Sequence, residues 1–217
     1  MTQKLKGYLR GVRGVLVTEL DQEGNNVEGG SSHWVDTAQQ VEIEAEVVDG
    51  ESADLRGGDR LLLRVEEDDI IVGADLTFRD ARFDAEATTL IGGGELIIAD
   101  AADAASSTNI DEGDYIGWVA PTIEEQATRT PFQADVYVQS FDDKGGREGY
   151  LVYSFAYCRG RMPQVSHSDR SWGTPEFEIK ARENSGKAIS TYQKRFVAAD
   201  ALASTPPDQI DLSTSGS

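Results

Sequence analysis

Few residues of this 217-residue sequence have the types and spacing that chemistry requires. The only cysteine, Cys158, stands in an apolar, aromatic segment between Tyr157 and Arg159. A thiol nucleophile needs a neighbouring base and access to solvent, whereas a small buried side chain needs neither, so we interpret Cys158 as a core residue. A single cysteine also excludes an internal disulfide and fits maturation in a reducing cytoplasm.

The histidines and the densest acidic run do not predict a metal site. His33 and His167 are far apart, and neither has a cysteine or a second histidine at ligand spacing, so we interpret both as loop residues. The run at 66–69 (EEDD) lacks the spacing of a calcium-binding loop, which favours a solvated turn.

The glycine run at 92–94 does not predict a phosphate-binding loop. No Lys-Ser/Thr follows it, and it ends a predicted helix, whereas phosphates bind where a helix begins. Because no base and nucleophile pair is found either, we predict no catalytic site, no metal and no cofactor. The protein is expected not to be an enzyme.

Net charge and hydropathy argue against two further classes of protein, non-specific nucleic-acid binders and membrane proteins. Twenty basic residues against 39 acidic ones give a net charge of −19, which argues against non-specific binding of nucleic acid, since phosphate affinity comes from lysine and arginine. The first eighteen residues are the exception, because they contain Lys4, Lys6, Arg10 and Arg13 and no acid. No apolar run reaches about 18 residues and no secretory signal is recognisable, so we expect no membrane insertion.

Period-two alternation supplies the main structural prediction. Val41, Ile43, Ala45 and Val47 alternate with Glu42, Glu44 and Glu46, which indicates a strand with an apolar face suited to the core and a face of three carboxylates. The glutamate face is explained by an exposed sheet face, by an edge strand protected by charge, or by the wall of a channel for polyanions.

Other segments complete a mainly β prediction with one helix. The helix is expected from residue 76, with Phe78, Ala87 and Ile91 on one face, to the glycine run at 92–94. A mobile loop is expected at 100–114, and a hairpin connection with Asp142, Asp143, Lys144 and Arg147 at 142–149. Further strands are predicted at 12–19, 60–65, 95–99, 132–138, 150–159 and 176–182. We expect one domain over 1–203 and a disordered tail over 204–217.

Three stretches are similar to the major tail tube proteins of long-tailed (siphovirus-type) bacteriophages. They are LRGGDR at 55–60 followed by DIIVGADLTFRDA at 69–81, LIGGG at 90–94, and WGTPEFEIKAREN at 172–184. The resemblance covers residues 5–200 and rests on the order of segments, because the family has no catalytic signature. It implies two packed β-sheets with one flanking helix, a β-sandwich or barrel with long loops.

The resemblance also implies a structural virion protein whose subunits form stacked six-fold rings. One sheet of each subunit would line a lumen through which DNA passes without specific binding during genome ejection. We place Glu42, Glu44 and Glu46 on the lumen wall and Asp142, Asp143, Lys144 and Arg147 in loops between subunits. The implied partners are further copies of the chain, the tape-measure protein and the tail terminator, and the implied location is the virion tail, assembled in the host cytoplasm.

Two alternatives remain open from sequence. The first is the inner tube of a contractile tail, a bacteriocin or a secretion system. The second is an acidic β-sandwich module that binds a receptor or carbohydrate, which predicts a stable monomer with an aromatic platform. Trp34, Trp118 and Trp172 are scattered along the chain, which disfavours such a platform.

Overall fold

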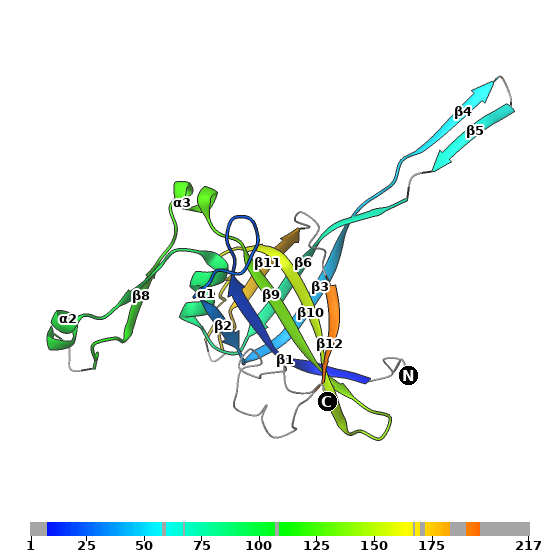
Figure 1. Ribbon diagram of the computed structural model, residues 1–217. Coiled ribbons are helices and arrows are strands. Elements are labelled where there is room, and N and C mark those ends of the chain that lie inside the picture. The colour runs from blue at the N-terminus through cyan, green and yellow to red at the C-terminus, as the bar shows by residue number, and fades with distance from the viewer. Residues whose placement is uncertain are drawn as a thin grey trace.

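In the computed structural model most of the chain forms β-strands, and an antiparallel sheet of eight strands contains the core (Figure 1). The structure describes residues 8–57, 60–66, 68–106, 109–166, 168–169, 172–182 and 190–195. The strands are β1 (Tyr8–Glu19), β2 (Ser32–Val35), β3 (Ala38–Val48), β4 (Ser52–Gly57), β5 (Arg60–Glu66), β6 (Ile70–Asp80), β7 (Glu95–Ile98), β8 (Tyr115–Val119), β9 (Phe132–Phe141), β10 (Arg147–Gly160), β11 (Glu176–Arg182) and β12 (Ser190–Arg195). The helices are α1 (Ala85–Gly92), α2 (Ala101–Ser106) and α3 (Ile123–Thr128).

The large sheet folds over itself, so that its two ends face each other across the core. Its strand order is β2-β1-β9-β10-β11-β6-β3, and β12 pairs with β10. Strand β10 makes the corner, because it pairs with β9 from Arg147 to Cys158 and with β11 from Cys158 to Gly160. The predicted mainly β architecture is confirmed, and the two layers are parts of one continuous sheet.

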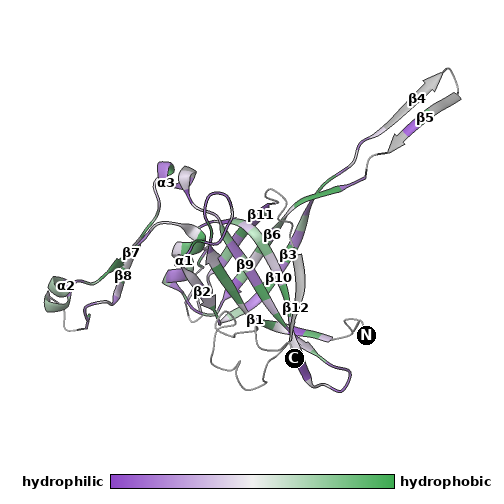
Figure 2. Cartoon of the chain, viewed as in Figure 1, coloured by the Kyte–Doolittle hydropathy of each residue, from purple (hydrophilic) through white to green (hydrophobic). Residues whose placement is uncertain are grey.

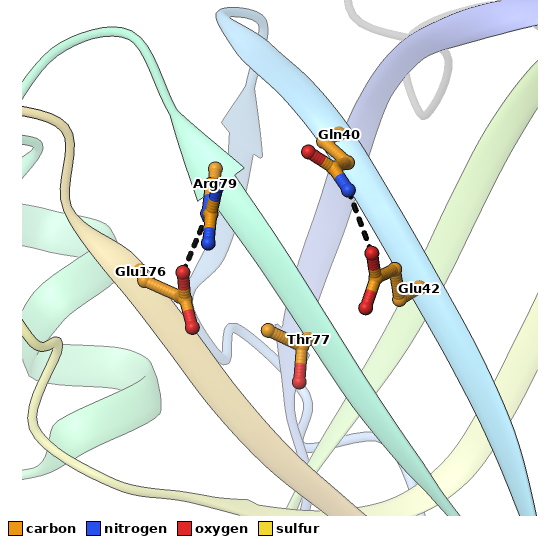
Figure 3. Close-up of a pocket in the computed structure, with 5 residues that line it drawn as sticks. All are labelled: Gln40, Glu42, Thr77, Arg79 and Glu176. Carbon is orange, nitrogen blue, oxygen red and sulfur yellow. Dashed lines mark hydrogen bonds and ion pairs between the residues drawn. The ribbon is translucent and has the colours of Figure 1, made fainter.

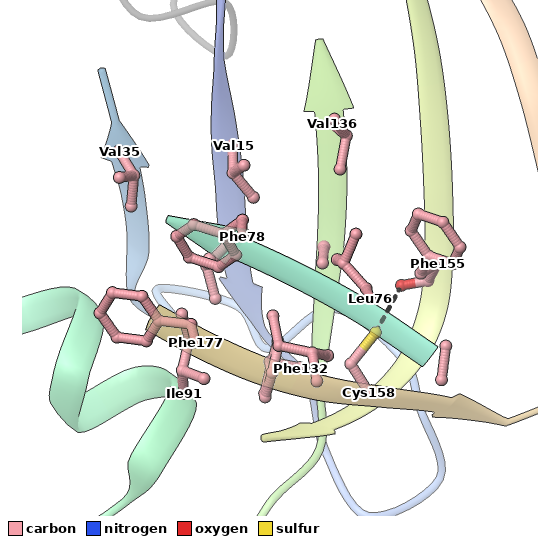
Figure 4. Packing of buried hydrophobic residues seen from close by; sticks show 14 of the residues in the cluster. Val15, Val35, Leu76, Phe78, Ile91, Phe132, Val136, Phe155, Cys158 and Phe177 are labelled. Carbon is pink, nitrogen blue, oxygen red and sulfur yellow. Dashed lines mark hydrogen bonds between the residues drawn. The ribbon is translucent and has the colours of Figure 1, made fainter. Parts of the chain in front are cut away.

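Alternate residues of the facing layers fill the core. Phe78 and Phe177 stack with ring centroids 4.7 Å apart, and Cys158 is fully buried and donates its thiol to the Phe155 carbonyl at 3.3 Å. Burial also raises the pKa of the Cys158 thiol, which favours the neutral form. Cys158 is therefore a core residue, as predicted. Figure 4 shows Val15, Val35, Leu76, Phe78, Ile91, Phe132, Val136, Phe155, Cys158 and Phe177 in this cluster.

The middle strands of the sheet are covered on both faces. A second cluster, on the face of β9 and β10 that points away from the core, joins Tyr137, Tyr150 and Val152 to Leu16, with Trp34 packed against it. Strand β10 is therefore covered on both sides over 150–155. The Trp34 side chain packs directly against the backbone of Gly14, since a Cβ atom added to Gly14 would lie 2.4 Å from Trp34.

Helix α1 ends where the sequence predicts but begins later. Its N-cap is Asp84, whose carboxylate accepts from the backbone N–H of Ala87 at 3.1 Å, and its C-cap is Gly93 at φ +76°. The expected start at residue 76 is wrong, because Leu76 and Phe78 lie in β6, where period two places them in the core. The expected loop at 100–114 is also corrected, since α2 occupies its first part.

Two arms leave the body of the molecule (Figure 1). The β4–β5 arm comprises the hairpin β4–β5 and the ends of β3 and β6 that carry it. The β7–β8 arm comprises the two-stranded ribbon β7–β8 with α2 at its far end. The expected tail at 204–217 lies outside the described residues.

Candidate assembly surfaces

The three predicted lumen residues share one face of the layer β3–β6–β11. Glu42 lies opposite Thr77, Glu44 opposite Asp75, and Glu46 opposite Gly73, while the core residues of β6 take the alternate positions. The glutamates therefore point away from the core, as the alternation predicts. The rest of this charged face consists of Asp75 and Arg79 of β6 with Glu176, Glu178, Lys180 and Arg182 of β11.

Basic side chains of β6 and β11 partly neutralise this charged face. Arg182 pairs with Glu46, and Lys180 Nζ lies 3.8 Å from Asp75 Oδ2. At the other end of the face Arg79 Nε lies 2.5 Å from Glu176 Oε2 (Figure 3). Positive and negative side chains therefore alternate on the charged face. In the folded chain, segment 41–47 does not form a uniformly negative wall.

Glu42 and Glu44 remain the acidic part of the charged face. Glu42 accepts from the side-chain amide of Gln40 at 2.7 Å, and the two lie beside Thr77, Arg79 and Glu176 around a small hollow (Figure 3). With a volume of about 40 Å³ the hollow is far below the roughly 300–1,000 Å³ of ligand pockets. Glu44 stands directly across from Asp75, a like-charge neighbour.

The apolar face of β3 is not buried as expected. Val41 packs against the core, but Ile43 is 42% exposed and Val47 is 44% exposed. The reason is position: β3 is the last strand of its layer, and it continues beyond the opposite layer into the β4–β5 arm (Figure 2). Opposite Val47 and Val48, Ile71 and Ile70 are more than 60% exposed.

One edge of β3 is also unpaired within the described ranges. Apart from the bulged Gln39, its residues form a ladder with β6 on one side. No described strand pairs with the other side, although β1 approaches β3 without pairing with it. Exposed strand edges are sites at which another chain adds, particularly where apolar side chains accompany them. We call Ile43, Val47, Val48, Ile70 and Ile71, together with this edge, the β3 edge surface.

The hairpin predicted between subunits is a tight turn between β9 and β10. The Asp142 carboxylate accepts from the backbone N–H of Lys144 at 2.8 Å and of Gly146 at 2.6 Å, which fixes the turn. Asp143, Lys144 and Arg147 are exposed. The hairpin itself is confirmed, and its contact with another subunit stays a prediction.

His33 is not an ordinary loop residue. It lies in β2, and its ring joins that strand to the start of α1: Nε2 lies 2.8 Å from Asp84 Oδ2, and Nδ1 lies 2.7 Å from Glu86 Oε2. Carboxylates only accept, so both ring nitrogens donate and the imidazole is protonated in this geometry. The hydrogen bond to Asp84, chiefly, raises the pKa of His33 above its ordinary value, against the opposing effect of burial.

Other polar side chains of the described ranges make structural contacts. Within the described ranges, no three His, Cys, Asp or Glu side chains gather in a geometry suited to a metal ion. Arg129 is committed to structure, since its guanidinium donates to the carbonyls of Ile91, Gly92 and Gly160 and so caps the end of α1. None of the helices in the described part of the chain has the length and apolar character to cross a bilayer. His167 lies outside the described residues.

Comparison with known proteins gives only low structural similarity in the match described below. No protein-family model and no curated protein matches the sequence. Among solved structures, the chain is similar to a chain of the anti-feeding prophage baseplate, a 6-fold symmetrised assembly. The two are 11% identical, the match covers 78% of this chain and 89% of the other, and the TM-score is 0.33. That score is too low to assign a fold or a function.

Sequence reasoning missed the two arms as exposed surfaces. The β7–β8 arm carries Ile97, Ile98, Tyr115 and Ile116, each 40–48% exposed. The available signal was the pair of short apolar runs on either side of the acidic segment 100–114. The contact of His33 with Asp84 joins residues 51 positions apart and has no local signal.

Proposed function

We propose that this chain is a non-catalytic structural subunit that assembles with copies of itself into the stacked rings of a phage tail tube. The observation that carries the proposal is the β3 edge surface, where Ile43, Val47 and Val48 of an eleven-residue edge strand stay exposed in the single chain. A sheet edge of this length and hydrophobicity is a liability in a monomer, and it is removed when a neighbouring copy pairs with it. The resemblance of 55–60, 69–81, 90–94 and 172–184 to tail tube proteins supplies the ring and its copy number.

In this proposal the charged face with Glu42, Glu44 and Glu46 lines the lumen. The two acids without a basic partner on the face, Glu42 and Glu44, keep it free of strong phosphate-binding positions, and the ion pairs of Glu46 and Asp75 hold the lysine and arginine side chains in place. DNA would then pass without specific binding, with screening limiting the repulsion to about 8 Å at physiological salt. The tape-measure protein and tail terminator are the proposed partners, and the virion tail, built in the host cytoplasm, is the proposed location.

The test is assembly of the purified protein. Light scattering and negative-stain microscopy over a range of concentration and salt are expected to show rings or tubes. A strictly monomeric species under every condition would overturn the proposal and favour a binding module. An inner tube of a contractile tail, a bacteriocin or a secretion system gives the same rings, and co-purification with a sheath protein distinguishes it.

A further inference from the structure

The β7–β8 arm exposes apolar side chains, although the Tyr115 ring contacts Phe83 of the body with ring centroids 6.2 Å apart. Its root, the end of the ribbon nearest α1, is attached to the body, because the indole N–H of Trp118 donates to the Gly93 carbonyl at 3.1 Å. Beyond the root, Ile97, Ile98 and Ile116 are exposed, and α2 at the far end has no buried residue. A lone two-stranded ribbon is marginally stable in water, so an arm of this kind is stabilised by a contact outside itself.

The charge on this arm has one sign. Between Arg82 and Arg129 the sequence contains no lysine or arginine, although the chain contains twenty. The exposed acids of the arm are Glu95, Asp100, Asp111, Glu112 and Asp114. A surface that combines exposed isoleucines with unopposed carboxylates fits a partner surface that is apolar and basic.

A surface of that kind lies at the other end of the body. Tyr8 of β1, Phe141 of β9 and Arg147 of β10 are directly opposite one another across three strands, so their side chains share a face. Arg10 is two residues along β1 on the same face, and Tyr8 is 67% exposed. We call Tyr8, Arg10, Lys144 and Arg147 the basic end.

The basic end has the composition of an interface centre. Exposed tyrosine and arginine are the residues that contribute most to binding at protein interfaces. Burial raises the pKa of Tyr150, and the positive charges of Arg13 and Arg147 nearby oppose that rise. Two hairpin acids flank the basic end: Asp142, whose carboxylate accepts from the turn, and Asp143, which is exposed.

The arm and the basic end lie on different sides of the body, so they cannot meet within one chain (Figure 1). Two unlike surfaces on one subunit make a heterologous contact, which repeats from copy to copy and generates rings or filaments. We propose that the outer part of the β7–β8 arm of one copy docks on the basic end of a second copy. This inference rests on the proposed self-assembly and names two surfaces that meet in it.

Charge reversal on each side tests the contact. The arm variant combines Asp111→Lys with Glu112→Lys, and the basic-end variant combines Arg10→Glu with Arg147→Glu; all four side chains are exposed. Each variant alone presents like charges at the contact, so its assembly concentration, read by light scattering, is expected to rise about tenfold over the unchanged chain. The shift is expected to shrink as salt is added.

A one-to-one mixture of the two variants is the decisive experiment. In the mixture every arm meets a basic end of opposite sign, so assembly is expected to return to within about threefold of the unchanged chain. The matched control, Glu23→Lys with Glu28→Lys, changes the charge equally on the β1–β2 loop and is expected to leave assembly unaltered. Circular dichroism establishes that each variant is folded, and Asp111→Asn with Glu112→Gln gives a milder second set with a smaller shift in the same direction.

The outcomes separate this inference from the proposed function. If the unchanged chain assembles and either variant assembles equally well alone, or the mixture does not recover, the docking contact is wrong and self-assembly stands. If the control shifts assembly as much as the variants do, net charge and not this contact is responsible, which also overturns the inference. If the unchanged chain never assembles, the proposed function fails first.

Discussion

Strands β3 and β10 are both rich in apolar residues, yet the single chain covers only one of them. Strand β10 lies in the middle of the sheet, where Phe155 and Cys158 face the core and Tyr150 and Val152 face the second cluster. Strand β3 lies at the end, where Ile43 and Val47 stay more than 40% exposed. The difference follows the position of each strand in the sheet. In the proposed assembly, the exposed residues of β3 form a contact with another copy.

The largest effect is expected in the covered strand. Phe155→Ala removes a fully buried ring from between the facing layers, and its cost to the free energy of unfolding is about 3–5 kcal/mol. Denaturant unfolding of the monomer measures it. A loss below about 1 kcal/mol would mean that the two layers do not pack as described.

The matching change on the edge strand should affect assembly more than folding. Ile43→Ser with Val47→Ser alters side chains that are already partly in water, so we expect a loss of about 1 kcal/mol per site in monomer stability. The assembly concentration should rise tenfold or more, because the apolar part of the β3 edge surface is lost. Unaltered assembly would place the subunit contact elsewhere.

A third prediction concerns the link between β2 and α1. The folded-state pKa of His33 is raised above the ordinary 6.5, so its contribution to stability is fully present below about pH 6.5 and is lost as pH rises through the folded-state value. His33→Gln should therefore unfold more easily than the unchanged chain in acid, and the difference should narrow towards alkaline pH. The control is Arg161→Gln, which breaks the exposed pair with Glu178 and leaves Asp84 and Glu86 unchanged.

A difference for His33→Gln that is constant with pH would contradict the protonated bridge. Titration of the His33 ring by NMR gives an independent reading. A pKa at or below 6.5 in the folded protein would show that Asp84 and Glu86 do not hold the charged form.

The smallest effect on folding is expected for the charged face. Replacing Glu42, Glu44 and Glu46 with glutamine removes no core contact and one exposed ion pair, so monomer stability should change by less than about 1 kcal/mol. Replacing all three with lysine should add a salt-sensitive retention of DNA by assembled tubes and slow genome ejection. Normal ejection at low salt would place this face outside the lumen, and failure to assemble would place it between subunits.

How far the sequence predicts the structure depends on the range of the interactions. Alternation in 41–47, 132–138 and 176–182 predicts β3, β9 and β11 because the period-two pattern is local. The start of α1 was missed although Leu76 and Phe78 alternate with charged neighbours, and α3 was missed although Thr122 and Glu125 form a capping box. The exposure of Ile43 and the bridge of His33 were beyond reach, because they depend on which strand ends the sheet and on a contact across 51 residues.

Hydrogen exchange on β3 before and after assembly tests the central claim most directly. Amides of β3 that point away from β6 have no described strand partner, so we expect them to exchange rapidly in dilute protein. Assembly should slow these amides strongly while those of β9, paired on both sides, stay slow in both states. Equal exchange of β3 in dilute and assembled protein would contradict the account, because the edge would then not be the surface at which copies meet.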